Sequence, residues 1–217
     1  MKNMILPALA LLPLLAFGET GEIAATNAIA YVEARADAGD VDAQAVLATC
    51  YLRGAGVKMD IAKAVRLFLS AATQGNIGAQ NNLAYCYANG IGVEKNDAEA
   101  VKWWRKAAEK GLAEAEYWLG ASYRDGLGVE KDLVKAQHWL RLAREKGFSP
   151  SGLTEDHMAQ LRQAAESGDA AAQNFLGKCY YLGEMVPLDR AEAKKWFMKS
   201  AAAGYEKAKL NLEKCME

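Results

Sequence analysis

Histidine is scarce in this chain, and so is any imbalance of charge. Of its 217 residues only His138 and His157 are histidines, and neither lies at a metal-ligand spacing such as H-x-x-x-H. Lys and Arg number 26 against 27 Asp and Glu, which gives a formal net charge of −1. A protein that binds nucleic acid through charge carries a basic surface. The sequence therefore predicts no metal, no cofactor and no nucleic-acid partner.

The residue patterns of several common catalytic sites are also missing. No serine is followed three residues later by lysine, and S-D-N, K-T-G and G-x-S-x-G do not occur. These patterns supply the nucleophile and its activating groups in serine β-lactamases and α/β-hydrolases. The four cysteines form no C-x-x-C pair, which disfavours a zinc or dithiol redox site. We therefore expect a protein that is not an enzyme.

A long apolar run occurs only at the N-terminus. It extends from Met4 to Phe17, after the single basic residue Lys2, and the small residues Ala16 and Gly18 suit a signal peptidase. Its 14 residues are fewer than the roughly 20 that a membrane-spanning helix needs. We expect residues 1–18 to be a signal peptide cleaved after Gly18, and the mature protein to be periplasmic or secreted without stable membrane insertion. An uncleaved membrane anchor is the alternative.

What the chain has in abundance is repetition. The segment from Gly75 to Gly111 recurs 36 residues earlier and 36 residues later, and further copies begin at Gly168 and, in part, at Gly204. Each copy contains two amphipathic segments separated by a glycine-rich turn, which indicates a helix-turn-helix unit. The second helix of each copy is preceded by a residue suited to an N-cap: Asp60, Asn96, Asp132 and Asp189. A fixed period of this size is typical of a solenoid.

The third copy shows the shared pattern most fully. Ala115, Leu119, Gly120, Tyr123, Gly126, Gly128, Val129, Asp132, Lys135, Ala136, Trp139, Ala143 and Gly147 follow it. This pattern resembles the Sel1-like repeat, a relative of the tetratricopeptide repeat. The resemblance implies an all-α, right-handed α/α solenoid and a non-enzymatic scaffold that binds a protein or peptide partner in signalling, envelope assembly or host interaction. Because some secreted, cysteine-rich Sel1-like proteins carry a β-lactamase label, β-lactam binding or hydrolysis is the alternative function.

The copies define the expected organisation of the mature chain. We expect an N-terminal capping helix in residues 19–41, three repeats in 42–147, an inserted linker and helix in 148–170, and a fourth repeat with a C-terminal capping helix in 171–217. Only 21 residues separate Gly147 from Gly168, so the insertion replaces part of a repeat. The sequence predicts a discontinuity there, between a block of three repeats and a shorter C-terminal block.

The four cysteines occupy one repeat position. Cys50, Cys86, Cys179 and Cys215 each follow a repeat glycine by 11 residues. Equivalent helices of adjacent repeats lie about 8–10 Å apart, whereas a disulfide needs Cα atoms within about 7 Å. We expect free thiols that pack as core residues. The disulfides Cys50–Cys86 and Cys179–Cys215 are the alternative.

Aromatic and polar residues supply the candidate binding site. Trp103, Trp139 and Trp196 share one position in the second helix, and we expect them in the core, whereas Trp118 lies at a variable position that suits a partner contact. In tetratricopeptide-like solenoids the first helices line a concave face that receives peptides. By this resemblance the expected partner-binding residues are Asn81, Tyr85, Asn89, Tyr117, Arg124, Asn174, Lys178 and Tyr181.

Overall fold

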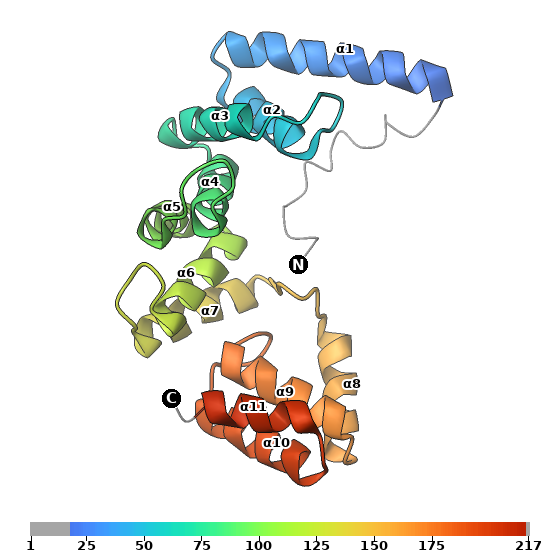
Figure 1. Ribbon diagram of the computed structural model, residues 1–217, viewed down its shortest axis with the longest axis vertical. Helices are drawn as coiled ribbons and strands as arrows, with labels where there is room; N and C mark the ends of the chain where they lie inside the picture. The colour runs from blue at the N-terminus through green and yellow to red at the C-terminus, as the bar shows by residue number, and fades with distance from the viewer. Residues whose placement is uncertain (1–17, 216–217) are drawn as a thin grey trace. The chain divides into compact units, whose positions relative to one another are not determined.

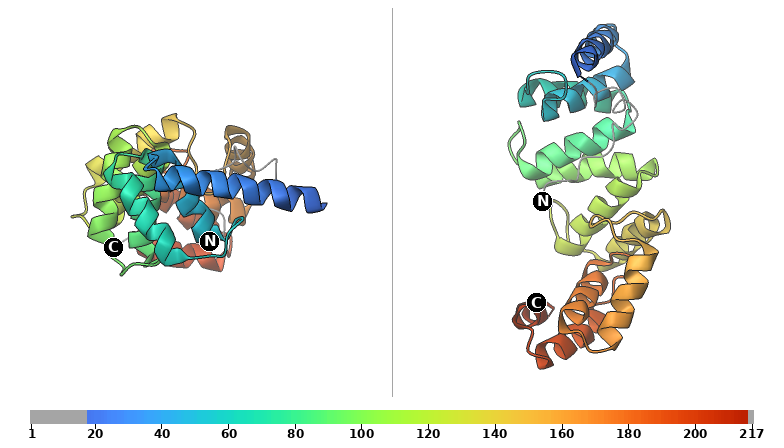
Figure 2. Two further views of the ribbon diagram at one scale, coloured as in Figure 1. Left: turned by 90° about the horizontal axis from the view of Figure 1, so that it is seen from above. Right: turned by 90° about the vertical axis from the view of Figure 1, so that its right-hand side faces the viewer.

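The computed structural model describes residues 18–215, and their side chains from residue 28 onward. Within this range the chain forms helices and no strand, which confirms the predicted all-α solenoid of 36-residue units (Figures 1 and 2). The predicted signal peptide lies outside the described residues except for Gly18, where the first helix begins. In the part of the chain that is described, no helix is both long enough and apolar enough to cross a membrane.

The helices form two compact units that divide between Lys110 and Gly111. The first unit contains α1 (Gly18–Asp37), α2 (Val41–Arg53), α3 (Ile61–Thr73), α4 (Ile77–Asn89) and α5 (Asp97–Glu109). Here α2 packs on α3 and α4 packs on α5, and each pair is one repeat. Helix α1 packs on α2 as a lone second-type helix, in the manner expected of a cap.

The second unit contains the interruption. Its helices are α6 (Ala113–Asp125), α7 (Leu133–Glu145), α8 (Glu155–Glu166), α9 (Ala170–Leu182), α10 (Arg190–Ala202) and α11 (Glu206–Lys214). The inserted helix α8 packs on α9, beside which it lies in the views of Figures 1 and 2.

The boundary between the two units falls one repeat earlier than the discontinuity predicted after Gly147. Two hydrogen bonds hold the third repeat to the fourth: Arg124 Nη1 donates to the Leu182 carbonyl, and Gln137 Nε2 donates to the Leu188 carbonyl, each over 3.0 Å. The inserted helix therefore does not detach the third repeat from the C-terminal block.

The helix ends follow the capping chemistry that the sequence indicates. The side chains of Asp60, Asn96, Asp132 and Asp189 each accept a hydrogen bond from a backbone N–H of the following helix, as predicted. In the fourth repeat Met185 occupies the place of a turn glycine and adopts a φ of 59°. That left-handed conformation is costly for a side chain, and the burial of Met185 in the core compensates for it.

A recurring glutamine joins each second helix to the first helix after it. Gln80 Nε2 donates to the Ala72 carbonyl over 3.1 Å, and Gln173 Nε2 donates to the Ala165 carbonyl over 3.0 Å. Both carbonyls lie at a helix C-terminus, where the last turn leaves acceptors without helical partners. At the equivalent position of the third repeat stands Glu116, which only accepts, and it receives a 2.5 Å hydrogen bond from Lys146 Nζ.

The deepest anchor of each second helix is one residue later than predicted. Phe68, Trp104, Leu140 and Phe197 are all buried, whereas of the preceding residues only Trp103 is buried and Trp139 and Trp196 are half-buried. Trp139 and Trp196 are therefore less buried than expected, although Trp196 packs against the core cluster of the fourth repeat. Lys199 Nζ lies 4.2 Å from the centroid of the Trp196 ring. A large indole at this position covers the core and keeps one side in water.

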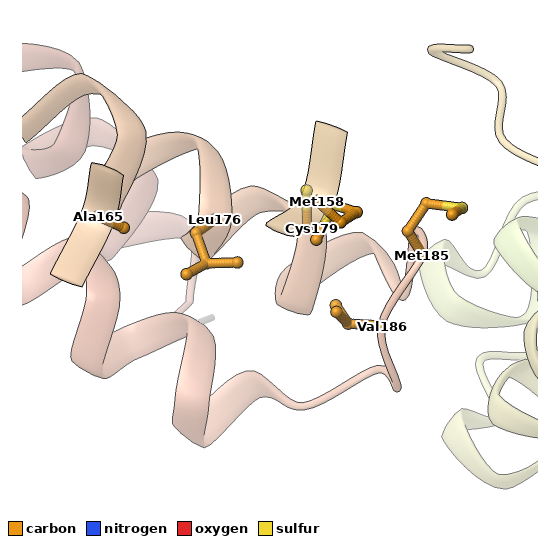
Figure 3. Close-up of a cluster of buried hydrophobic side chains, with 6 residues drawn as sticks. All are labelled: Met158, Ala165, Leu176, Cys179, Met185 and Val186. Carbon is orange, nitrogen blue, oxygen red and sulfur yellow. The ribbon is translucent and has the colours of Figure 1, made fainter. Parts of the chain in front are cut away.

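The core around the insertion is assembled from three segments. Met158 and Ala165 of α8 meet Leu176 and Cys179 of α9, and Met185 and Val186 of the following turn close the cluster (Figure 3). Leu153 from the linker and Trp196 pack against it. Helix α8 thus performs the packing role of a second-type helix for the fourth repeat.

Candidate functional site

Half of the predicted partner-binding residues are buried. Asn81, Tyr117 and Asn174 all lie six residues after a repeat glycine, and each exposes less than a tenth of its surface. In the second unit the reason is visible: Asn211 Nδ2 of α11 donates to Asn174 Oδ1 of α9 over 2.8 Å. This position joins neighbouring first helices, so its side chains are not presented to a partner.

Arg124, the fourth buried member, fastens the third repeat to the fourth. Besides its bond to the Leu182 carbonyl, its guanidinium makes two hydrogen bonds with the carboxylate of Asp125, over 2.8 and 2.6 Å. Tyr117 lies close by and packs against Phe148 of the linker, with 5.6 Å between ring centroids. Burial raises the pKa of the Tyr117 hydroxyl, so this ring stays neutral. Both residues stabilise the fold rather than form an open surface.

The remaining four predicted residues are more accessible. Asn89 is exposed, and Tyr85, Lys178 and Tyr181 are half-buried. Asn89 Nδ2 donates to the Tyr85 carbonyl over 2.9 Å, and the Arg190 guanidinium lies 5.3 Å from the centroid of the Tyr181 ring. Tyr85, Asn89 and Lys178 therefore remain candidates for partner contact.

The more accessible face of each first helix is a stripe with i, i+3, i+7 spacing, of which only Thr49 and Ala121 are buried among the described residues. It comprises the residues that follow each repeat glycine by 7, 10 and 14, and such residues share one helix face. In α4 these are Asn82, Tyr85 and Asn89, and in α9 they are Phe175, Lys178 and Leu182. We call this set the first-helix stripe. Trp118 belongs to it and is half-buried, in accord with its predicted variable position.

Among the residues at the start of the stripe, sequence reasoning identified only Trp118 as a partner contact. The residue seven places after each repeat glycine varies in chemistry: Val46, Asn82, Trp118, Phe175 and Asn211. The residue that follows it is leucine in every copy. The residue before it varies as well, yet Asn81, Tyr117 and Asn174 are buried, so variation alone does not distinguish the open position from the buried one.

A polar cluster around Glu184 was also missed. Its Oε1 accepts hydrogen bonds from Ser149 Oγ over 2.7 Å, from the Ser151 backbone N–H over 3.1 Å, and from Ser151 Oγ. Glu184 is buried, and a buried carboxylate needs such donors. The cluster ties the linker to the turn of the fourth repeat, and it contains neither lysine nor histidine to activate a serine.

Both histidines have structural roles. His157 Nδ1 accepts a hydrogen bond from the Thr154 backbone N–H and completes the capping box of α8. The imidazole of His138 lies edge-on to the Trp139 ring, with 5.2 Å between centroids. Among the described residues, no group of three or more His, Cys, Asp or Glu is arranged to hold a metal ion.

All four cysteines are free thiols in the structure, and they differ in exposure. Cys86 and Cys179 are buried, whereas Cys50 and Cys215 are half-buried. Burial raises the pKa of the Cys86 thiol to about 11 and that of Cys179 to about 12. Burial also raises the pKa values of the Cys50 and Cys215 thiols.

This difference predicts an order of alkylation. Because the thiolate is the reactive form, we expect iodoacetamide at pH 8 to modify Cys50 and Cys215 well before Cys86 and Cys179 in the folded protein. Peptide mass analysis at successive times measures the order, and all four thiols should react once the protein is unfolded in urea. Two pairs that resist alkylation until a reductant is added would instead establish the disulfide alternative.

The sequence and fold match known proteins over most of the chain. The Sel1 repeat family model matches residues 41–76, 77–112, 113–148 and 170–205. No curated protein matches significantly. The chain is 34% identical in sequence to c5321, and its fold matches the crystal structure of c5321 with a TM-score of 0.58. That protein is described as a protective antigen present in uropathogenic Escherichia coli strains displaying an SLR fold. The match covers 87% of this chain and 44% of c5321, so the chain spans less than half of that protein.

A Sel1 repeat protein from Oxalobacter formigenes is likewise 34% identical, with a TM-score of 0.51 over 79% of this chain and 74% of its own. The family-model matches also stop at residue 148 and resume at residue 170, which coincides with the inserted linker and helix. Four matched repeats, together with the repeated helix pairs and glycine turns, establish that this chain belongs to the Sel1 repeat family.

Proposed function

We propose that this protein is a non-enzymatic scaffold that binds a protein or peptide partner on its first-helix stripe. Sel1 repeats generally mediate protein–protein interaction, and proteins built from them are typically scaffolds without catalytic activity. One observation carries the choice of surface. Most of the stripe differs in chemistry between repeats and is still accessible, with Asn89 exposed and Asn82, Tyr85 and Trp118 half-buried. Amides and aromatic rings of this kind suit the binding of a polypeptide segment.

We further propose that the scaffold is exported, on the basis of the apolar segment Met4–Phe17 and the small residues before Glu19. Its partner then lies in the periplasm or outside the cell. The peptide mass analysis described for the thiols also tests this point. An N-terminal peptide that begins at Glu19 in the exported fraction supports the proposal, and one that retains Lys2 contradicts it.

Site-specific photo-crosslinking in living cells tests the binding face. We expect a photoreactive amino acid at Asn82 or Asn89 to form one discrete adduct with a partner protein, because both positions lie on the first-helix stripe. Lys102 is the matched control, since it is an exposed residue of a second helix in the same unit and pairs with Glu99. Adducts of equal yield from Lys102, or none from the two stripe positions, would refute this choice of surface.

A further inference from the structure

Three lysines without carboxylate partners lie on the first-helix face of α9 and α11. Lys178 follows Phe175 by three residues in α9, and Lys207 and Lys214 flank Asn211 in α11 with i, i+4 and i+7 spacing. Residues so spaced share one face of a helix. The hydrogen bond between Asn211 and Asn174 holds that face of α11 beside α9. Lys178 therefore lies on the first-helix face of α9, and Lys207 and Lys214 lie on the corresponding face of the adjacent α11.

The charge of this surface is not neutralised locally. None of the three lysines pairs with a carboxylate of the described residues, whereas the neighbouring Lys209 and Lys195 pair with Glu206 and Glu192 over 2.8 Å each. Lys207 and Lys214 are exposed, and Lys178 is half-buried. The two helices contain four lysines (Lys178, Lys207, Lys209 and Lys214) against the two carboxylates of Glu206 and Glu213, so the local excess is two positive charges. A local excess of one sign attracts ligands of the other.

Two large apolar side chains are exposed on the same pair of helices. Phe175 is 39% exposed, and Leu210, which immediately precedes Asn211, is 60% exposed. The Asn174 and Asn211 amides bond to each other, and Asn174 is buried, so they hold the two helices together and do not contact a partner. An apolar anchor beside charged groups is the composition of a polypeptide-binding surface.

We propose that this surface of α9 and α11 binds an acidic polypeptide segment that also carries large apolar side chains. Carboxylates of the segment pair with Lys178, Lys207 and Lys214, and its apolar side chains pack on Phe175 and Leu210. A nucleic acid is disfavoured as the partner, because its phosphate backbone would not make apolar contacts with Phe175 and Leu210. The inference rests on the proposed scaffold function and adds the chemistry of the partner.

The first-helix stripe of the first unit provides a comparison. Its residues Asn82, Tyr85 and Asn89 carry no charge. In α2 the stripe contains a single charge, Arg53. The preference for acid is therefore expected mainly from the second unit, and the uncharged α4 part of the stripe offers an independent place to detect partner binding.

Titration of a labelled synthetic peptide into the full chain tests this proposal. The peptide has Glu at alternate positions with Phe and Leu between them, and its counterpart has Gln in place of every Glu. At low salt we expect the acidic peptide to bind at least about tenfold more tightly than the Gln peptide, with an advantage that shrinks as salt is added. Fluorescence anisotropy measures both affinities.

Variants assign the effect to named residues. The triple variant Lys178→Gln, Lys207→Gln, Lys214→Gln should lose about tenfold in affinity for the acidic peptide and most of its salt dependence. The matched triple Lys102→Gln, Lys195→Gln, Lys209→Gln lowers the net charge by the same three units, but it removes lysines that pair with glutamates. It should stay within about twofold, because these lysines are not among those proposed to contact the peptide. Phe175→Ala should weaken both peptides alike. Circular dichroism confirms that each variant is folded.

Three results would overturn the proposal: equal affinity for the two peptides, equal losses from the two triple variants, or displacement of the acidic peptide by an oligonucleotide of equal charge at equal concentration. Such an outcome leaves the proposed function testable on its own, because the crosslinks from Asn82 and Asn89 report on the first unit. Crosslinks there without an acidic preference would retain the scaffold and reject this partner chemistry. Failure of the crosslinks alone would reject the binding surface proposed in the first unit and retain the acidic preference of the second.

Discussion

Replacement of Phe68 by alanine is expected to lower the free energy of unfolding by about 3–5 kcal/mol. Phe68 is 0% exposed and lies in the core of the first repeat, between α3 and α2. Removal of its ring leaves a cavity that the surrounding helices fill only in part, so the loss includes both the transfer of the ring and the cavity. Urea denaturation followed by circular dichroism measures the change.

The neighbouring Leu67 is the matched control. It occupies the position where Trp103, Trp139 and Trp196 stand in the other repeats, and it is half-buried. Leu67→Ala should cost only about 1–2 kcal/mol, because part of the side chain is already in water. Equal losses from the two substitutions would mean that the tryptophan position is as deep as the one after it, as first predicted from the sequence.

The second prediction compares the substitution of alanine for glycine at two helical positions, for which helix propensity alone predicts the same change in stability. Gly120→Ala is expected to destabilise the protein by about 1–3 kcal/mol. A Cβ at Gly120 would lie 2.8 Å from Leu140 Cγ, 3.0 Å from the Leu140 backbone nitrogen and 3.2 Å from the Ala136 carbonyl oxygen. Because two of these atoms are backbone, α6 and α7 would have to separate to admit the methyl group.

Gly78→Ala should have the opposite sign. Gly78 lies in α4, and a Cβ there would meet only Asn76 Oδ1, at 3.5 Å. Alanine loses less backbone entropy than glycine on forming a helix, so a gain of about 0.5–1 kcal/mol is expected. Urea midpoints of the two variants give the comparison directly. A stabilising Gly120→Ala would show that α6 and α7 do not approach as closely as the structure indicates.

The repeat positions explain how much of the fold could be predicted. Local backbone chemistry determines the glycine turns, the four aspartate and asparagine caps and the 36-residue period. These features can therefore be predicted from the sequence. The inserted helix was predicted within residues 148–170 and is found as α8, Glu155–Glu166, with Thr154 and Ser167 as its caps. Its packing on α9 through Met158 and Ala165 is a detail that only the structure shows.

The candidate site was less predictable, because neighbouring helix positions differ by only one residue in sequence. Asn81 and Asn82 are the same amino acid, yet the first is buried and the second half-buried. A second pair of positions shows the same difficulty. Trp103 and Trp104 are both buried, whereas at the equivalent positions of the next repeat Trp139 is half-buried and Leu140 is buried. Periodicity indicates that a helix has a packed side, but it does not determine the width of that side when three neighbours surround the helix.

The sequence by itself determined the helix pairs, their ends and their family, since these follow from local conformational preference repeated at a fixed period. Only the tertiary structure decided which positions are open to a partner. Arg124 and Tyr117 were predicted from the sequence to bind a partner. In the structure Arg124 donates a hydrogen bond to a carbonyl of the fourth repeat, and Tyr117 packs against a ring of the linker. Lys178, Lys207 and Lys214 are ordinary surface lysines until α9 and α11 bring them together. Such neighbours come from distant segments, and contacts of that kind leave no local pattern in the chain.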